Sequence, residues 1–381
     1  MAPAADDLAA WVRLMQTPGV GALTARQLLS AFGPPQQIFD SSHSALARVV
    51  SQAVAHALLA PPEADTRDLI ARTLDWAAEP GHACIRLGDA DYPQSLLDTA
   101  DPPPLLYALG DAILLNAPRR LAMVGARNPS AQGERDANAF AQAFSSAGVT
   151  IVSGFALGID AAAHRGALAA TGRHAGSTIA VLGTGCDRVY PPRHRDLAHA
   201  VAEHGLLLSE FPLGTAPARG NFPRRNRVIS GLARGVLVVE AATHSGSLIT
   251  ARLAGEQGRE VFAIPGSIHN PLAHGCHRLI RDGAKLVETA ADVLEEFGWN
   301  APRPPAESPP TATVPHQDHG SPAAPDCDVL RALGHDIRDF DELSARTGWP
   351  ADRLGARLLD LELQGDVARL PGGRFQRIAR A

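Results

Sequence analysis

The sequence predicts an α/β protein of several parts, with a doubly wound, mainly parallel sheet at its centre. Short apolar runs alternate with amphipathic stretches from about residue 81 to 299, which is the pattern of such a sheet. A Pro-rich segment follows this region, and the 381 residues are too many for one ordinary core. We therefore expect a central sheet domain with smaller domains on either side.

The composition is that of a globular protein, with 45% hydrophobic and 20% charged residues and a formal charge of -5. A mild negative charge argues against a protein that coats nucleic acid over its whole surface, so any such binding must be local. We find no apolar run of membrane-spanning length, and residues 1–8 are acidic, unlike a signal region. The four cysteines are scattered; we expect no disulfide, metal site or cofactor, and a cytoplasmic location.

Residues 1–80 predict a small all-α domain. Apolar residues recur there at helical spacing and are interrupted by Pro18-Gly19-Val20-Gly21. Helix, glycine hairpin, helix is a pattern whose backbone amides can hold a DNA phosphate. A helical bundle that docks on its neighbour is the alternative, and the shortage of arginine near the hairpin favours it.

Residues 81–299 predict the central domain. We expect strands at 84–87, 121–124, 149–152, 178–182, 206–208, 236–239, 261–264 and 285–287. Amphipathic helices are expected between most of them, at 131–146, 159–170, 193–204 and 248–257. Such sheets bind ligands beyond the carboxyl ends of their strands.

Residues 300–325 are rich in Pro, Ala and Ser and predict an extended tether. Residues 326–381 predict a winged helix, with helices at 329–333, 340–346 and 353–363 and two short strands around Pro371-Gly372-Gly373. The third helix carries Arg353 and Arg357, but it also carries Asp352, Asp360 and Glu362. A helix that reads a DNA groove should be more basic, so we favour a protein contact for this domain.

One segment of the central domain has a single sign of charge. Five arginines and no Asp or Glu stand between Phe211 and Val239, in a chain that is acidic overall. Phe222 lies among these arginines, and an aromatic ring flanked by guanidinium groups is suited to a base and its neighbouring phosphates. The alternative is a core aromatic that anchors the loop.

Glycine-bearing loops follow several of the expected strands. Arg127 stands in the first, Ser153 and Gly154 open the second, and Ser245-Gly246-Ser247 follow a later strand. Glycine allows backbone amides to approach an oxyanion, although in a doubly wound fold it also serves simply to turn the chain. Neither G-x-G-x-x-G nor G-x-x-x-x-G-K-[ST] is present, so a dinucleotide or ATP site is disfavoured.

Histidines offer a weaker signal. Asp160 and His164 stand four apart on an expected helix, but no third catalytic or metal partner has a predictable place. We therefore interpret this pair as helix capping and packing. His269, His274 and His277 fit no zinc spacing.

At these residues the chain resembles the DNA-processing protein A family (DprA, also called Smf). The motifs that carry the resemblance, in the family's order over about residues 85 to 290, include 124–129, 153–164, 179–183, 208–212, 222–232, 238–241, 245–251 and 256–266. The resemblance implies an extended Rossmann-like domain that binds single-stranded DNA without sequence preference. It also implies a homodimer through that domain, and delivery of the recombinase RecA onto incoming DNA in natural transformation.

The resemblance also implies a DNA-binding site, and with the arginine-rich segment it gives a set of candidates. They are Arg127, Ser153, Gly154, Arg219, Phe222, Arg224, Arg225, Arg227, Ser245, Gly246 and Ser247. Arg219 stands where Lys is common in the family, and Ala126 where Ser or Thr is common. The first change keeps the charge but alters its reach, and the second removes a hydroxyl donor.

On this basis we expect a non-enzymatic, single-strand DNA-binding recombination mediator. The rival is a Rossmann-type nucleotide hydrolase of the lysine-decarboxylase-like class, which carries a P-G-G-x-G-T motif. Pro265-Gly266-Ser267 stops short of that motif, which disfavours the rival. A winged-helix regulator whose central domain senses a ligand is disfavoured by the acidic third helix.

Overall fold

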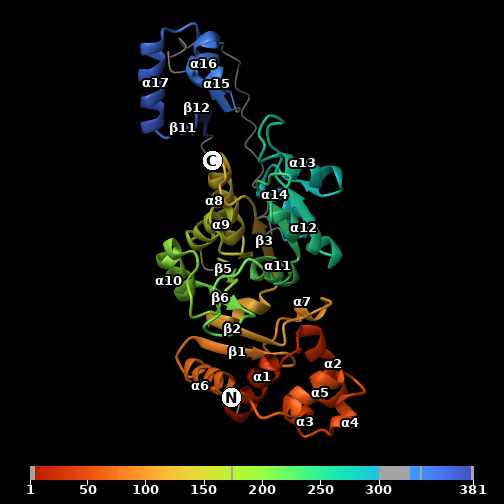
Figure 1. Cartoon of the computed structure of the whole chain (residues 1–381). Helices are drawn as coiled ribbons and strands as arrows, with labels where there is room; N and C mark the ends of the chain where they lie inside the picture. The colour runs from red at the N-terminus through yellow and green to blue at the C-terminus, as the bar shows by residue number, and fades with distance from the viewer. Residues whose placement is uncertain (1–4, 173–174, 300–326, 335–336, 379–381) are drawn as a thin grey trace, which may run out of the picture.

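The computed structural model describes residues 5–172, 175–299, 327–334 and 337–378. Within them lies a nine-stranded sheet in the order β1-β2-β6-β5-β4-β3-β7-β8-β9, at the middle of the molecule in Figure 1. The strands from β6 to β9 are parallel, whereas β1, β2 and β6 pair antiparallel. Their bounds are β1 (His82–Arg86), β2 (Leu105–Gly110), β3 (Arg120–Val124), β4 (Thr150–Ser153), β5 (Thr178–Val181), β6 (Leu206–Ser209), β7 (Gly235–Val238), β8 (Glu260–Ala263) and β9 (Lys285–Leu286). The predicted doubly wound α/β fold is confirmed.

Helices cover both faces of this sheet because its strands are apolar on both sides. In β3, Leu121 and Met123 belong to one buried cluster, and Ala122 and Val124 to the cluster on the opposite face. The first face is covered by α8 (Ala131–Ser146), α9 (Ile159–Leu168), α10 (Arg195–His204) and α14 (Ala290–Glu296), and the second by α7 (Gln94–Leu97), α11 (Asn221–Leu232), α12 (Ser247–Glu256) and α13 (His274–Arg281). Two 3-10 turns, η1 (Ala112–Asn116) and η2 (Pro192–His194), complete this part.

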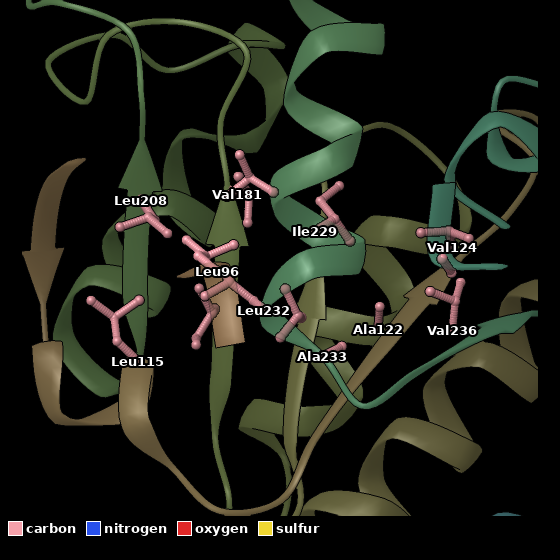
Figure 2. Packing of buried hydrophobic residues seen from close by; sticks show 14 of the residues in the cluster. Leu96, Leu115, Ala122, Val124, Val181, Leu208, Ile229, Leu232, Ala233 and Val236 are labelled. Carbon is pink, nitrogen blue, oxygen red and sulfur yellow. The ribbon is translucent and has the colours of Figure 1, made fainter. Parts of the chain in front are cut away.

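Helix α11 is the centre of the second face. Figure 2 shows Ile229 and Leu232 of this helix among buried sheet residues such as Ala122 and Val181. Burying a leucine side chain of this kind contributes about 2 kcal/mol to folding. The helix is therefore fixed firmly on the strands beneath it.

The order of the strands reverses at β3. This strand has β4 on one side and β7 on the other. The chain passes from β6 to β7 through α11, and this helix contacts β5, β4 and β3. The crevice at such a reversal, beyond the carboxyl ends of the strands, is where doubly wound sheets bind their ligands. The loops after β3, β4, β5 and β7 therefore position the candidate site.

The N-terminal helices pack against the antiparallel edge of the sheet. Leu8 of α1 and Leu69 of α6 share a buried cluster with Tyr107 of β2, and Figure 1 shows this part beside β1 and β2. The remaining helices enclose a second cluster of their own. Val20, in the hairpin turn, is buried in that cluster, as a docked helical bundle requires. The helices are α1 (Ala5–Gln16), α2 (Ala22–Phe32), α3 (Pro35–Phe39), α4 (His43–Leu46), α5 (Gln52–Leu59) and α6 (Ala64–Ala77).

The C-terminal part lies beyond α8 in Figure 1. It consists of α15 (Cys327–Leu333), β10 (Ile337–Asp339), α16 (Phe340–Thr347), α17 (Ala351–Leu363), β11 (Val367–Leu370) and β12 (Arg374–Arg377). The three strands form a sheet in the order β10-β12-β11, and β11 and β12 are the hairpin of a wing. Leu354 and Leu358 of α17 pack against Phe375 of the wing. Arg135 of α8 donates a hydrogen bond of 3.1 Å to the carbonyl of Gly365, which connects this part to the sheet domain.

Several elements differ from the sequence-based expectation, among them the helices α7, α13 and α14, which were not predicted. Strand β2 was not predicted, because Pro102, Pro103 and Pro104 precede it and gave its segment the character of a loop. Helix α11 begins at Asn221, so the arginine-rich stretch, which was not among the expected helices, is helical. Strand β10 was also missed. The expected tether at 300–325 lies outside the described residues, and among those described no helix is long and apolar enough to cross a membrane.

Candidate nucleic-acid interface

An open groove of about 790 Å³ lies at the carboxyl ends of the central strands. Its walls are the loop after β3, the loop after β4, the first two turns of α11 and the loop after β7. The predicted residues Arg127, Arg219, Phe222 and Ser245 all line it. Sequence segments that are far apart therefore meet at one rim of the sheet, as the topology predicts.

The accessible charge of the groove is positive. Arg127 and Arg219 are exposed on it, and the Arg127 guanidinium carbon lies 5.6 Å from the centroid of the Phe222 ring. Among the described residues that line the groove, Asp160 is the one that carries a carboxylate. It is 7% exposed and accepts a hydrogen bond of 3.2 Å from the backbone amide of Ala156. Such a surface attracts an anion.

Two aromatic side chains stand at the edge of the groove. Phe222 is half-buried, and its ring lies so close to Gly183 that a Cβ there would come within 2.8 Å of it. The ring of Tyr190 is 5.7 Å from the Phe222 ring between centroids, with the planes 37° apart. Tyr190 is 43% exposed. Their remaining exposed surface is a platform on which a nucleic-acid base can stack.

Sequence reasoning missed Tyr190. The residue lies after β5, well before the arginine-rich segment, and only the fold brings it to Phe222. The signal that could have found it is local: Tyr190 is followed by Pro191 and Pro192, in a loop that leaves the carboxyl end of a predicted strand. Together with Phe222 it also lines a small cavity of about 70 Å³ behind the groove.

The far wall of the groove is the start of α12. Gly246 precedes the helix and is exposed, and the hydroxyl oxygens of Ser245 and Ser247 lie 2.7 Å apart. Free backbone amides and the helix dipole make a helix start favourable for a phosphate. The structure places Ser245, Gly246 and Ser247 at this wall of the groove, and their contact with a phosphate stays a prediction.

Arg225 lines the groove but is only 4% exposed. Its guanidinium donates hydrogen bonds to the carbonyls of Gly154 and Val181, at the ends of β4 and β5. Burial lowers the pKa of its guanidinium to about 10, and the nearby Asp160 carboxylate opposes that shift. Arg225 is thus charged at neutral pH but is engaged inside the protein.

Arg227 and Arg224 face away from the groove. Both donate to the same Glu210 oxygen, Arg224 at 3.2 Å and Arg227 at 2.5 Å, and Arg227 also lies 3.1 Å from a carboxylate oxygen of Asp101. Burial raises the pKa of Glu210, and the two arginines act against that shift. The structure contradicts a free phosphate contact for Arg227, because its guanidinium is buried in this ion-pair cluster. Arg224 remains half-exposed over the Phe211 ring.

Ser153 and Gly154 belong to the interior. The Ser153 hydroxyl is fully buried and donates a hydrogen bond of 2.6 Å to the carbonyl of Met123 in β3. Gly154 is buried above the Arg225 guanidinium. The expectation that Ser153 offers a free hydroxyl to a phosphate is therefore wrong, since side chains alternate along a strand and this one faces inward.

The Asp160–His164 pair is buried beneath the same loops. The Nδ1 atom of His164 lies 2.7 Å from the Thr178 hydroxyl, and the whole side chain is inaccessible to solvent. Burial, with the charges of His194, Arg225 and Arg165, lowers the pKa of His164 to about 3, so the ring is neutral. Within the described ranges no cluster of His, Cys, Asp and Glu is suited to a metal ion.

Comparisons with known proteins point to one family. The family model of DNA recombination-mediator protein A matches residues 83–298, and that of the DprA winged helix domain matches residues 301–373. Protein Smf of Escherichia coli K12 is 44% identical over 322 residues, which cover 83% of this chain and 82% of that protein.

Two solved structures are also similar. The X-ray structure of DNA processing protein A from Streptococcus pneumoniae has a TM-score of 0.65 and 36% identity, and the match covers 76% of this chain and 97% of that one. A structure that concerns the single-stranded DNA binding mode of DNA processing protein A from Helicobacter pylori has a TM-score of 0.51 and 28% identity, and covers 57% and 95%.

Proposed function

The chain belongs to the DNA recombination-mediator protein A family, and from that premise we propose that it binds single-stranded DNA without sequence preference and mediates recombination. Its role would be to protect incoming DNA and to load RecA onto it, as in natural transformation. The relative from Helicobacter pylori, whose structure concerns its single-stranded DNA binding mode, supports the choice of ligand.

The observation that carries the proposal is the groove itself. It places two exposed guanidinium groups, Arg127 and Arg219, beside the Phe222 ring and across from the start of α12. Guanidinium groups and helix amides bind phosphates of any sequence, and an aromatic ring stacks on any base. A duplex keeps its bases paired and away from such a ring, so the groove favours a single strand.

We assign the contacts of the proposed site from this arrangement. Arg127, Arg219 and the Ser245–Ser247 segment would bind phosphates, and Phe222 with Tyr190 would stack on bases. Arg224 would act only at the periphery. Arg225, Arg227, Ser153 and Gly154 would support the site from inside.

The proposal describes a binding protein and not an enzyme. His164, the buried histidine below the groove, is neutral and inaccessible, so it offers no general base to a ligand in the groove. We further propose a homodimer through the sheet domain, RecA as the protein partner and a cytoplasmic location. Crosslinking with and without oligo-dT, followed by size-exclusion chromatography, tests the dimer and its stoichiometry.

Fluorescence anisotropy with labelled oligo-dT and the matching duplex tests the ligand. We expect the single strand to bind more tightly, and log Kd to rise with log salt concentration by about 0.7 for each phosphate contacted. A preference for the duplex, or affinity that is independent of salt, contradicts the proposal. Incubation with nucleoside monophosphates should release no free base.

A further inference from the structure

Arg225 is an arginine of α11 that is 4% exposed, on a helix whose Val228, Ile229 and Leu232 belong to the buried apolar cluster. Removing a guanidinium from water is costly, so its burial needs compensating contacts. The compensation comes from the carbonyls of Gly154 and Val181, which both accept hydrogen bonds from its Nη1 atom, and from the Asp160 carboxylate. These contacts join α11 to the ends of two neighbouring strands.

The same turn of α11 carries Phe222, three residues earlier. Phe222 packs on Gly183, two residues beyond Val181 in the loop after β5, and Asn221 donates a hydrogen bond of 3.1 Å to the Gly183 carbonyl. Arg225 therefore binds the end of β5, and the loop that follows β5 carries Gly183, on which the Phe222 ring packs. The ring and its support are fixed to each other through this side chain.

Arg225 also holds the loop after β4. Phe155, directly after Gly154, has a φ of 61°, which is unusual for a residue with a side chain. The loop keeps this shape because Arg225 binds the Gly154 carbonyl and Asp160 accepts from the Ala156 amide. Ala156 lines the groove, so the buried contact between Arg225 and the Gly154 carbonyl sets the position of this part of its wall.

We propose that Arg225 is a positioning residue for the groove: it binds no phosphate, and it sets Phe222 and the loop after β4 in place for a single strand. This inference rests on the proposed function. Its rival is a direct role, in which the Arg225 guanidinium leaves the carbonyls and pairs with a phosphate.

The salt dependence of binding separates the two roles. A side chain that neutralises a phosphate contributes about 0.7 to the slope of log Kd against log salt concentration. A side chain that acts through the position of Phe222 contributes to affinity but not to the slope. Arg127→Ala, which removes an exposed groove charge, gives the reference loss of slope.

Arg225→Lys is the first variant. It keeps the positive charge next to Asp160 but replaces the planar guanidinium group by a single ammonium group. We expect Kd for oligo-dT to rise about tenfold, as for a weakened base stack, with an unchanged salt slope. Arg48→Lys, at an exposed position in the N-terminal helical part, is the matched control and should leave both values unchanged. A reduced slope, or an unchanged Kd, overturns the inference.

Gly154→Ala tests the same contact without touching the arginine. A Cβ at this position would lie 2.7 Å from the Arg225 guanidinium carbon and so displace it from the two carbonyls. We expect the same loss of affinity at an unchanged slope. This variant decides the question if Arg225→Lys does not fold, which thermal denaturation of each variant would show.

A double-mutant cycle with Phe222→Ala completes the test. Because Arg225 acts in part through the ring, its replacement by lysine should change Kd by a smaller factor once the ring is gone, and fully additive effects overturn the inference. The wild type is the control for the function itself. If it does not bind oligo-dT, the proposed function fails; if it binds and only the Arg225 expectations fail, the positioning role fails alone.

Discussion

The rings of Tyr190 and Phe222 lie 5.7 Å apart between centroids and form one aromatic edge of the groove. The two residues come from different loops, since Tyr190 follows β5 and Phe222 stands in the first turn of α11. The contact is therefore a product of the fold and joins the two elements at the rim of the sheet. It also makes Tyr190 a residue whose role in binding is open to test.

Replacing Tyr190 by alanine should weaken the binding of oligo-dT about tenfold, because one base loses its stacking surface and Phe222 loses its neighbour. Tyr190→Phe keeps the ring and should stay within about twofold of the wild type, since a sequence-tolerant stack does not depend on the hydroxyl. Fluorescence anisotropy at fixed salt measures both. Equal affinities for the alanine variant and the wild type would remove Tyr190 from the site.

Replacing Arg127 by alanine should raise Kd and lower the salt slope by about 0.7, because one released counterion is lost. The loss should be alike for oligo-dT and for strands of mixed sequence, since the contact is with the backbone of the DNA. Anisotropy titrations over a range of salt concentrations give both quantities. Arg48→Ala removes an equal charge far from the groove and should leave the slope unchanged; an effect confined to one DNA sequence would contradict a phosphate contact.

Replacing Arg227 by alanine should act on stability instead of binding. The change leaves the buried Glu210 with Arg224 as its remaining arginine partner, and breaking a buried ion pair in this way costs about 3 kcal/mol. Urea denaturation measures the loss of unfolding free energy. The Kd of the folded fraction for oligo-dT should change less than about twofold, well below the effect of losing a stacked base. Weak binding by a fully stable variant would show that Arg227 contacts the DNA.

His164 should make the protein less stable as the pH falls. Its pKa in the folded state is about 3, below its ordinary value of 6.5, because the ring is buried near His194, Arg225 and Arg165. Between these two values the unfolded chain binds a proton that the folded protein does not, so this contribution to stability is complete above pH 6.5 and decreases as the pH falls toward 3.

The size of this effect follows from the same difference in pKa. At pH 5 the loss should be about 2 kcal/mol relative to neutral pH. Urea denaturation at several pH values measures it, and His164→Gln should flatten the curve over this range. An unchanged pH profile in the variant would assign the dependence to other groups, of which His194, whose pKa is also lowered by burial, is the first to examine.

The sequence was sufficient to predict the parallel strands of the sheet and the edge at which the candidate site lies. Strands that are buried on both faces appear as short apolar runs, and those at β3 to β8 were located to within a residue or two of their bounds. The carboxyl ends of parallel strands share one edge, so Arg127 and Ser245 could be placed together from the sequence.

The direction of the arginine side chains could not be predicted in the same way. The segment 219–227 was not among the expected helices. Pro223 is accepted in the helix because it lies in the first turn, where its missing N–H has no intrahelical partner. In a helix, neighbours point about 100° apart, so Arg224 and Arg225 face different surroundings. Which of them is buried depends on the carbonyls of β4 and β5, which are distant in sequence.

Helix α11 has a further consequence, because it lies on the connection that takes the chain from β6 across the sheet to β7. The groove is lined by Arg127 of the loop after β3, by Phe222 of α11 itself and by Ser245 of the loop after β7. A strand of DNA bound in the groove would contact loops from both halves of the sheet and so connect them. Occupied molecules should therefore resist the parting of these halves, and the bound state should melt later than the free one.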